Sequence, residues 1–342
     1  MTTVPPSRPL LPVLARMAAG LLLAGGGALL AWQNVTLHPT PGMSVLDTPL
    51  SVPLDGPLPL DLAQSAALTF SGDLVDVTLR ALPPGSALAV QGRVHHRARN
   101  PVQADVTRQG RALSAALTLR VQPLGQRGVI VTGPEPVQHT AALTLSRDVP
   151  FTLGSRTTYG DTTADLSALR VRFLTLRSDS GRQTLTLPAR PAGPLSVVTR
   201  SGQVSVTAPP GSAPDALRVN TASGNQTLDL AAMRTQTLGV GTESGDVRLT
   251  LPTVTGRATL TTDSGNLTVT ATPSTRGNLD IRTQRGDVTL RVPPALKVRV
   301  RFTDRDSLSW PRGAPAPLAP DLDVFVDAPR ANFTLTPLED TP

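Results

Sequence analysis

Apolar and polar positions recur as one short motif between about Leu174 and Val292. It reads apolar-x-apolar-x-Thr, with Ser in the first copy, then two residues, Gly, a polar residue, and mostly apolar-x-apolar. Six clear copies place their glycines 20 to 22 residues apart, and a weaker seventh copy keeps the phase. The seven glycines are Gly160, Gly181, Gly202, Gly224, Gly245, Gly265 and Gly286. A fixed period near 21 residues with alternating apolar positions is typical of a β-repeat.

The alternation within one motif predicts two strands that meet at a corner. Side chains alternate along a strand, so Leu238, Val240 and Thr242 share one face, and Val247 must face the same way after the turn. Thr242 and Val247 are an odd number of steps apart, so the turn has to reset the alternation. Glycine at Gly245 can adopt positive φ without steric cost, which suits such a corner.

We therefore predict an all-β fold, a right-handed β-helix-like solenoid with about 21 residues per rung. Stacking the rungs would place like residues over like, in columns of Leu, Val and Thr. Gly-Asp and Gly-Asn also suit two-residue hairpin turns, so an antiparallel β-sandwich of hairpins is the alternative.

The segments on either side of the repeat (151–294) are also predicted to be β or irregular. Residues 65–150 contain alternating apolar runs with less regular spacing. Residues 34–64 are rich in proline, which predicts an extended linker or an irregular lead-in strand. Residues 295–342 contain alternating runs around a proline-rich stretch, and we expect capping strands there because an open end would leave unpaired edges.

Residues 1–33 carry a predicted membrane signal. Arg8 and Arg16 precede 16 uncharged residues, from Met17 to Trp32. This length is short for a span and typical of a signal-peptide core, but Arg16 could reach the headgroups and allow a longer segment. We predict a cytoplasmic stub and an uncleaved single-pass signal-anchor, a transmembrane helix with the rest of the chain outside the cytoplasm. A cleaved signal peptide, leaving a secreted protein, or a buried helix are the alternatives.

The amino-acid composition excludes some classes of site and partner. The chain has no cysteine, which excludes thiol catalysis, disulfides and cysteine-bound metal. Its net charge is +7, which could suit nucleic acid, anionic lipid or an acidic polymer, or could reflect an ordinary arginine-rich surface. Aromatic residues make up only 3% of the chain, whereas nucleic-acid grooves usually combine basic side chains with stacking aromatics. We therefore expect no nucleic-acid partner.

One basic cluster is a candidate anion-binding patch. It consists of Arg93, Arg97, Arg99, Arg108 and Arg111. Guanidinium groups bind phosphate and carboxylate, so the patch could hold phosphate, lipid headgroups or an acidic wall polymer. An exposed, merely solvated hairpin would give the same pattern.

No other residues form a convincing catalytic or metal site. His95 and His96 are adjacent and would point to opposite faces of a strand, which disfavours joint metal binding. The acidic residues after the repeat glycines, such as Asp246, lie about 21 residues apart, whereas calcium-binding β-rolls need a short Gly-rich period. Known nucleophile, phosphate-loop and zinc motifs are missing from the sequence. We expect no cofactor, no metal and no enzymatic activity.

The repeated motifs resemble a known family. Ser244-Gly245-Asp246-Val247, Ser264-Gly265-Asn266-Leu267 and Arg285-Gly286-Asp287-Val288 are similar to motifs of the bacterial putative-adhesin domain of unknown function. This family is described as a toastrack-type β-solenoid related to the outer domains of some envelope-stress regulators. The resemblance spans roughly residues 66–292. It implies an envelope-facing module whose ligand is generally unknown, and it supplies no catalytic residues.

These observations predict a membrane-anchored, extracytoplasmic structural or interaction module of the cell envelope. Its partner would be the membrane through residues 1–33, together with a protein or an anionic envelope polymer. A sensor or regulatory partner of an envelope-stress system is one alternative. A carbohydrate-active β-helix enzyme is another, although sugar-cleaving sites need a paired acid and base that the sequence does not display together.

Overall fold

The alternating apolar positions fold into strands throughout the part of the chain that the structure describes. The computed structural model describes residues 44–54, 64–122, 139–191, 193–304, 306–311 and 319–338. These residues form 25 strands and no helix, so none of their elements is a helix able to cross a membrane. The predicted signal-anchor at residues 1–33 lies outside the described residues. From Val45 onward the chain forms one unit, and Met1–Ser44 falls in another.

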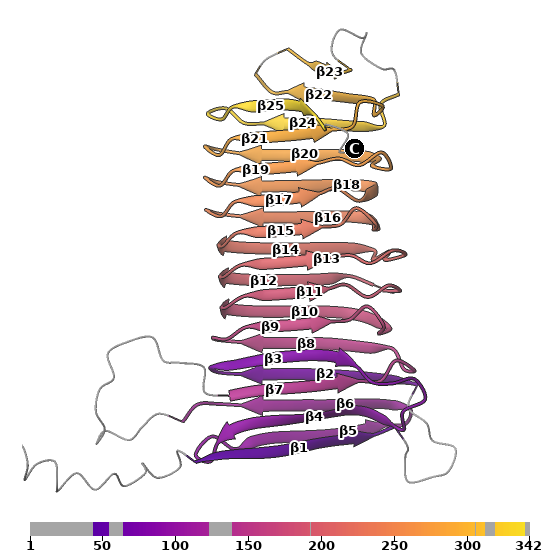
Figure 1. The fold of residues 1–342 in the computed structure, drawn as a ribbon, viewed down its shortest axis with the longest axis vertical. Coiled ribbons are helices and arrows are strands. Elements are labelled where there is room, and N and C mark those ends of the chain that lie inside the picture. Colours follow the sequence, from indigo (N-terminus) through magenta and orange to yellow (C-terminus); the bar gives the residue numbers. More distant parts are fainter. Residues whose placement is uncertain are drawn as a thin grey trace, which may run out of the picture. The chain divides into compact units, whose positions relative to one another are not determined.

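The strands belong to two sheets, shown in Figure 1. The 12-stranded sheet contains, in spatial order, β1 (Val45–Pro53), β4 (Leu88–Arg97), β7 (His139–Leu145), β3 (Val75–Ala81), β9 (Thr162–Asp165), β11 (Gln183–Thr186), β13 (Val204–Thr207), β15 (Gln226–Asp229), β17 (Val247–Thr250), β19 (Leu267–Thr270), β21 (Val288–Val292) and β25 (Phe333–Pro337). The 13-stranded sheet contains β23 (Leu308–Trp310), β22 (Val298–Phe302), β24 (Leu322–Asp327), β20 (Gly277–Thr283), β18 (Thr253–Thr262), β16 (Arg234–Thr242), β14 (Ala216–Ser223), β12 (Leu195–Ser201), β10 (Val171–Ser180), β8 (Phe151–Thr157), β2 (Ser65–Gly72), β6 (Ala112–Leu119) and β5 (Val102–Gln109).

Each repeat contributes one strand to each sheet, and successive repeats pair in parallel and in register. On the 13-stranded sheet the first apolar position of each motif aligns with that of the next repeat. The aligned residues are Leu174, Leu195, Leu217, Leu238, Ala258 and Leu279. Inward side chains of both sheets form one aliphatic core. This parallel pairing is what a solenoid requires, and the antiparallel hairpin alternative does not describe the repeat.

The repeat glycines lie where one rung passes closest to the next. Gly160, Gly181 and Gly202 have φ values of 120°, 119° and 154°, as the corner argument expected. The other four repeat glycines do not have φ in the left-handed region, so positive φ is the wrong reason for glycine at these positions, which are Gly224, Gly245, Gly265 and Gly286. A Cβ atom at Gly265 would instead lie 1.9 Å from the carbonyl oxygen of Gly245 in the rung before it. The corner therefore needs glycine because backbone approaches backbone too closely for any side chain.

Hydrogen bonds from polar side chains join the corners of neighbouring rungs. The Asn266 N–H donates to Asp246 Oδ1 at 3.0 Å, and the Asp287 N–H donates to Asn266 Oδ1 at 3.1 Å. Within one rung, Thr262 Oγ1 accepts from the Gly265 N–H at 2.9 Å. The same kind of bond recurs in earlier rungs, where the Asp161 N–H donates to Asp76 and the Arg182 N–H donates to Asp161. It recurs in the last rung, where the Asn332 N–H donates to Asp287. These acidic and amide side chains thus bind backbone N–H groups of the next turn.

Strand order is exchanged at both ends of the stack. Strand β6 comes after β2 in the sequence, yet β2 lies between β6 and β8 in the sheet. Strand β24 comes after β22 in the sequence, yet it lies between β20 and β22. Strands β24 and β25 therefore complete a regular rung, and β22 with β23 lies beyond them. Residues 45–53, inside the expected proline-rich linker at 34–64, form edge strand β1 antiparallel to β4. An edge strand tolerates Pro49 and Pro53 because its outer side has no pairing partner.

Candidate functional site

The five arginines predicted as an anion patch lie at one end of the stack but on different elements. Arg93 and Arg97 are on β4 of the 12-stranded sheet, and Arg108 is on β5 of the 13-stranded sheet. Arg99 and Arg111 follow these two strands. Arg108 donates to the Leu54 carbonyl oxygen at 2.7 Å. The five come from both sheets and do not line one face, and their joint role as an anion patch stays a prediction.

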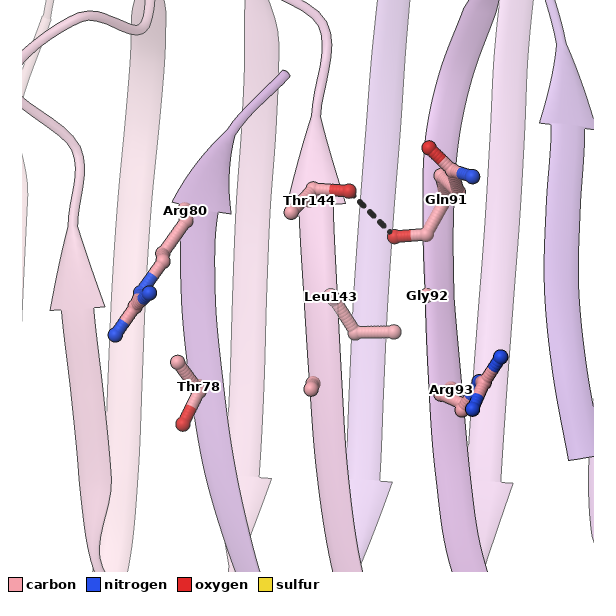
Figure 2. Close-up of a pocket in the computed structure, with 8 residues that line it drawn as sticks. Thr78, Arg80, Gln91, Gly92, Arg93, Leu143 and Thr144 are labelled. Atoms are coloured by element: carbon pink, nitrogen blue, oxygen red, sulfur yellow. Dashed lines mark hydrogen bonds between the residues drawn. The ribbon is translucent and has the colours of Figure 1, made fainter. Parts of the chain in front are cut away.

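Arg93 instead borders a concavity on the outer face of the 12-stranded sheet. The concavity measures about 540 Å³ and is formed by β3, β7 and β4. Figure 2 shows Arg80 on β3 and Arg93 on β4, on either side of β7. Its other outward lining side chains are Thr78, Gln91, Ala142 and Thr144.

Strand register explains the shape of this concavity. Thr144 on β7 lies between Arg80 and Gln91, and Ala142 lies between Thr78 and Arg93. The middle strand, β7, carries small side chains, so the sheet surface is lower there than on its two neighbours. The two arginines lie on opposite sides of β7 and are offset from each other along the strands. Neighbouring strands are about 4.8 Å apart, so the two arginine backbones are roughly 10 Å apart across the sheet. Thr144 Oγ1 donates to the Gln91 carbonyl oxygen at 2.9 Å (Figure 2), which links the floor to one wall.

Both arginines are exposed and retain access to solvent. The Arg93 side chain is 66% exposed, and its Nη1 lies 3.4 Å from Asp47 Oδ2. Arg80 lies near Asp165, and the pKa of that carboxyl group is lowered mainly by hydrogen bonds from Ser167, with Arg80 adding to the effect. The exposed ion pair between Arg93 and Asp47 is weak and can be exchanged for a ligand anion. The concavity can therefore offer two guanidinium groups to a carboxylate or phosphate.

A row of small hydroxyl side chains continues from the concavity along the sheet. Thr78 aligns with one outward residue of each following strand, at steps of about 4.8 Å. The aligned residues are Thr163, Thr184, Ser205, Thr227, Arg248, Thr268, Thr289 and Thr334. Thr184, Thr227 and Thr334 are exposed. We call this file the hydroxyl row.

Sequence reasoning missed both Arg80 and the hydroxyl row. Alternation within β3 places Asp76, Thr78 and Arg80 outward, which was a usable signal for one strand. Pairing of β3 with β7, more than 50 residues later in the chain, carries no local signal. Among the described residues, no three His, Asp or Glu side chains gather as a metal site.

The two buried histidines among the described residues have structural partners. His95 is exposed and His96 is buried, as alternation along β4 requires. His96 Nε2 lies 2.8 Å from Thr48 Oγ1, and its Nδ1 lies 3.0 Å from the Arg97 carbonyl oxygen. His139 is also buried, and its Nε2 lies 2.9 Å from Asn100 Nδ2.

Burial of His139 is expected to make stability depend on pH. Desolvation lowers its pKa below the ordinary 6.5, outweighing the hydrogen bond to the Asp73 carbonyl oxygen, which raises it. The unfolded chain therefore takes up the proton first, and stability falls as pH drops through 6.5. We expect the urea midpoint to decrease between about pH 8 and about pH 5.5, and His139→Gln to reduce that decrease. The exposed His95→Gln is the control, and an equal effect of both variants would contradict this assignment.

Comparison with known proteins places the fold in a family. The sequence profile of the family Toastrack DUF4097 matches residues 136–310. A solved structure described as a putative cell adhesion protein from Clostridium sporogenes has 10% identity and a TM-score of 0.30, covering 86% of this chain and 100% of that chain. One described as a putative adhesin from Bacteroides fragilis has 9% identity and a TM-score of 0.37, covering 87% and 99%.

A structure also described as a putative adhesin, from Parabacteroides distasonis, has 10% identity and a TM-score of 0.38, covering 86% of this chain and 97% of that chain. None of the curated proteins matches this chain. The profile match runs from the residues just before β7 to the end of β23 and covers more than half of the sequence. The chain therefore belongs to the Toastrack DUF4097 family.

Proposed function

We propose that this chain is a non-catalytic display and binding module of the cell envelope. Residues 1–33 act as a signal-anchor, and the unit from Val45 onward lies outside the cytoplasm as a right-handed coil, the hand that parallel crossovers prefer. Its partner is an anionic envelope polymer. The anionic groups bind between Arg80 and Arg93, and the polymer runs along the hydroxyl row.

The observation that carries this proposal is the concavity together with the hydroxyl row. Two exposed guanidinium groups at one end of a file of hydroxyls, which Arg248 interrupts once, suit a repeating, charged, hydroxyl-rich ligand better than a compact one. Parallel register keeps the file straight over successive rungs. The sheet is broad and open, which favours binding along a surface over enclosure of a substrate.

A direct binding measurement tests the partner class. Polygalacturonate supplies carboxylates and polyphosphate supplies phosphates, so the two probes separate the possible anions. We expect Arg80→Ala with Arg93→Ala to weaken binding at least about tenfold and to reduce its salt dependence. Arg177→Ala with Arg282→Ala, both exposed on the 13-stranded sheet and therefore away from the hydroxyl row, is the matched control. Equal losses in the two double variants would mean non-specific attraction and would overturn the site.

Topology is tested separately. An alkaline phosphatase fusion after residue 40 should be active, because this enzyme needs an environment outside the cytoplasm. An inactive fusion would reverse the assigned orientation. Crosslinking of the chain in membranes, followed by its purification, identifies what it binds. Recovery of one defined protein in place of polymer would favour a sensor or regulatory role in an envelope-stress system.

A further inference from the structure

The end of the stack that carries β1 and β5 has an open apolar groove. Strands β1 and β5 are the edge strands of the two sheets at this end, as the lower part of Figure 1 shows. A groove of about 180 Å³ lies between them. It is lined by Leu50 and Val52 of β1 and by Ala104 and Val106 of β5, with Leu117 among the other lining residues. Arg108 reaches across to the Leu54 carbonyl oxygen, next to the end of β1.

Exposed aliphatic side chains gather at this end. Val45 is 61% exposed, Leu46 is 46% exposed and Val106 is 50% exposed. All three are on the edge strands β1 and β5. Elsewhere in the described residues Leu308, on β23 at the opposite end, is the remaining large aliphatic side chain with comparable exposure. Of the three, Val106 also lines the groove, and an exposed aliphatic group beside an apolar groove is typical of a contact surface.

Charge also distinguishes the two ends. Residues 44–54 and 88–122 contain six arginines and two aspartates, a net charge of +4. The described residues from 293 onward contain three arginines, one lysine and five aspartates, a net charge of −1. Basic side chains around exposed aliphatic groups fit an anionic lipid surface, where the aliphatic groups enter the interface and the arginines meet the headgroups.

Strand β1 is a poor edge for pairing with a second copy of the chain. Pro49 and Pro53 lie on edge strand β1 and have no N–H group to donate to an added strand. Strand addition by another copy is therefore disfavoured at this edge. The hydrated headgroup region can satisfy the unpaired backbone groups of an edge strand without strand pairing, so the prolines do not oppose contact with a lipid surface.

We propose that this end of the stack rests on an anionic bilayer surface, with Val45, Leu46 and Val106 at the lipid interface. The inference rests on the proposed N-terminal anchor, because β1 is the described strand nearest to that anchor in the sequence. The rungs then extend away from the membrane, and the acidic end lies furthest from it.

The absence of cysteine makes a site-specific test possible. The full chain carrying Val106→Cys is labelled with the environment-sensitive dye NBD and incorporated into nanodiscs. One set of discs contains phosphatidylcholine alone, and the other an equimolar mixture with phosphatidylglycerol. We expect blue-shifted emission and at least about twofold weaker iodide quenching in the anionic discs. Leu308→Cys, at the opposite end, should show no difference between the two lipids.

Charge reversal gives the matched control. Arg111→Glu with Arg120→Glu, both exposed at the ends of β6, should abolish the lipid-dependent change at the Val106 label. Arg177→Glu with Arg248→Glu should leave it intact. If the chain enters the discs but the Val106 label responds equally in both lipids, this inference is wrong and the anchor stands. If the chain does not co-purify with discs, the anchor is contradicted and the inference falls with it.

Discussion

Replacing Gly265 with alanine is expected to lower the free energy of unfolding by about 3 kcal/mol. The new Cβ would lie 1.9 Å from the Gly245 carbonyl oxygen and 2.6 Å from its carbonyl carbon. Both are backbone atoms, which cannot rotate away as a flexible side chain can. Relief requires the two rungs to separate, and separation also stretches the bond from the Asn266 N–H to Asp246.

Gly239→Ala is the matched control for Gly265→Ala. Gly239 lies on β16 and points outward, and a Cβ there would meet only the Arg218 side chain at 3.9 Å. This variant should be neutral or slightly stabilising, because glycine within a strand is entropically unfavourable. Thermal and urea unfolding, monitored by circular dichroism, measure the stability of both variants. Wild-type stability of Gly265→Ala would show that the rungs are not held this closely.

Replacing Leu260 with alanine is expected to cost about 2–5 kcal/mol of stability. Leu260 is fully buried on β18 and pairs in register with Val240 before it and Ile281 after it. The cavity would break the aliphatic column at one rung, and in a repeat stack neighbouring rungs supply most of the support for each other. Amide hydrogen exchange should therefore accelerate most in β16, β18 and β20.

Leu308→Ala is the control for Leu260→Ala. Leu308 is 43% exposed on β23, so its truncation should change stability by less than about 0.5 kcal/mol. Urea titration gives both values. A uniform rise in exchange over the whole stack after Leu260→Ala would indicate a single cooperative unit and would contradict the local effect.

The repeat could be predicted from the sequence because its pairing is local and identical from rung to rung. Leu217 lies beside Leu238 for the same reason that Gly224 lies beside Gly245, namely a constant period near 21 residues. The cause of the glycine requirement was only partly predictable. Positive φ can be argued from one corner, but a close approach such as that of Gly265 to Gly245 depends on the distance between two rungs.

The candidate site could not be predicted in the same way. Arg80 and Arg93 are brought together by parallel pairing of β3 with β7 and antiparallel pairing of β4 with β7. These strands share no period, so no pattern along the chain shows which of them become neighbours. Proline content was similarly ambiguous, because Pro49 suits both a linker and an edge strand.

Because strand order is exchanged at the two ends, the end strands cannot gain all their neighbours in the order in which the chain is synthesised. The rung made by β2 and β3 gains both neighbours in the 13-stranded sheet only after β6 and then β8 have been made. Likewise β22 has no parallel partner until β24 is inserted between it and β20. Contacts that close long loops form late, so the regular middle rungs should assemble first and template both termini. A ribosome-bound chain that stops short of β8 would expose the unpaired side of β2 to other chains.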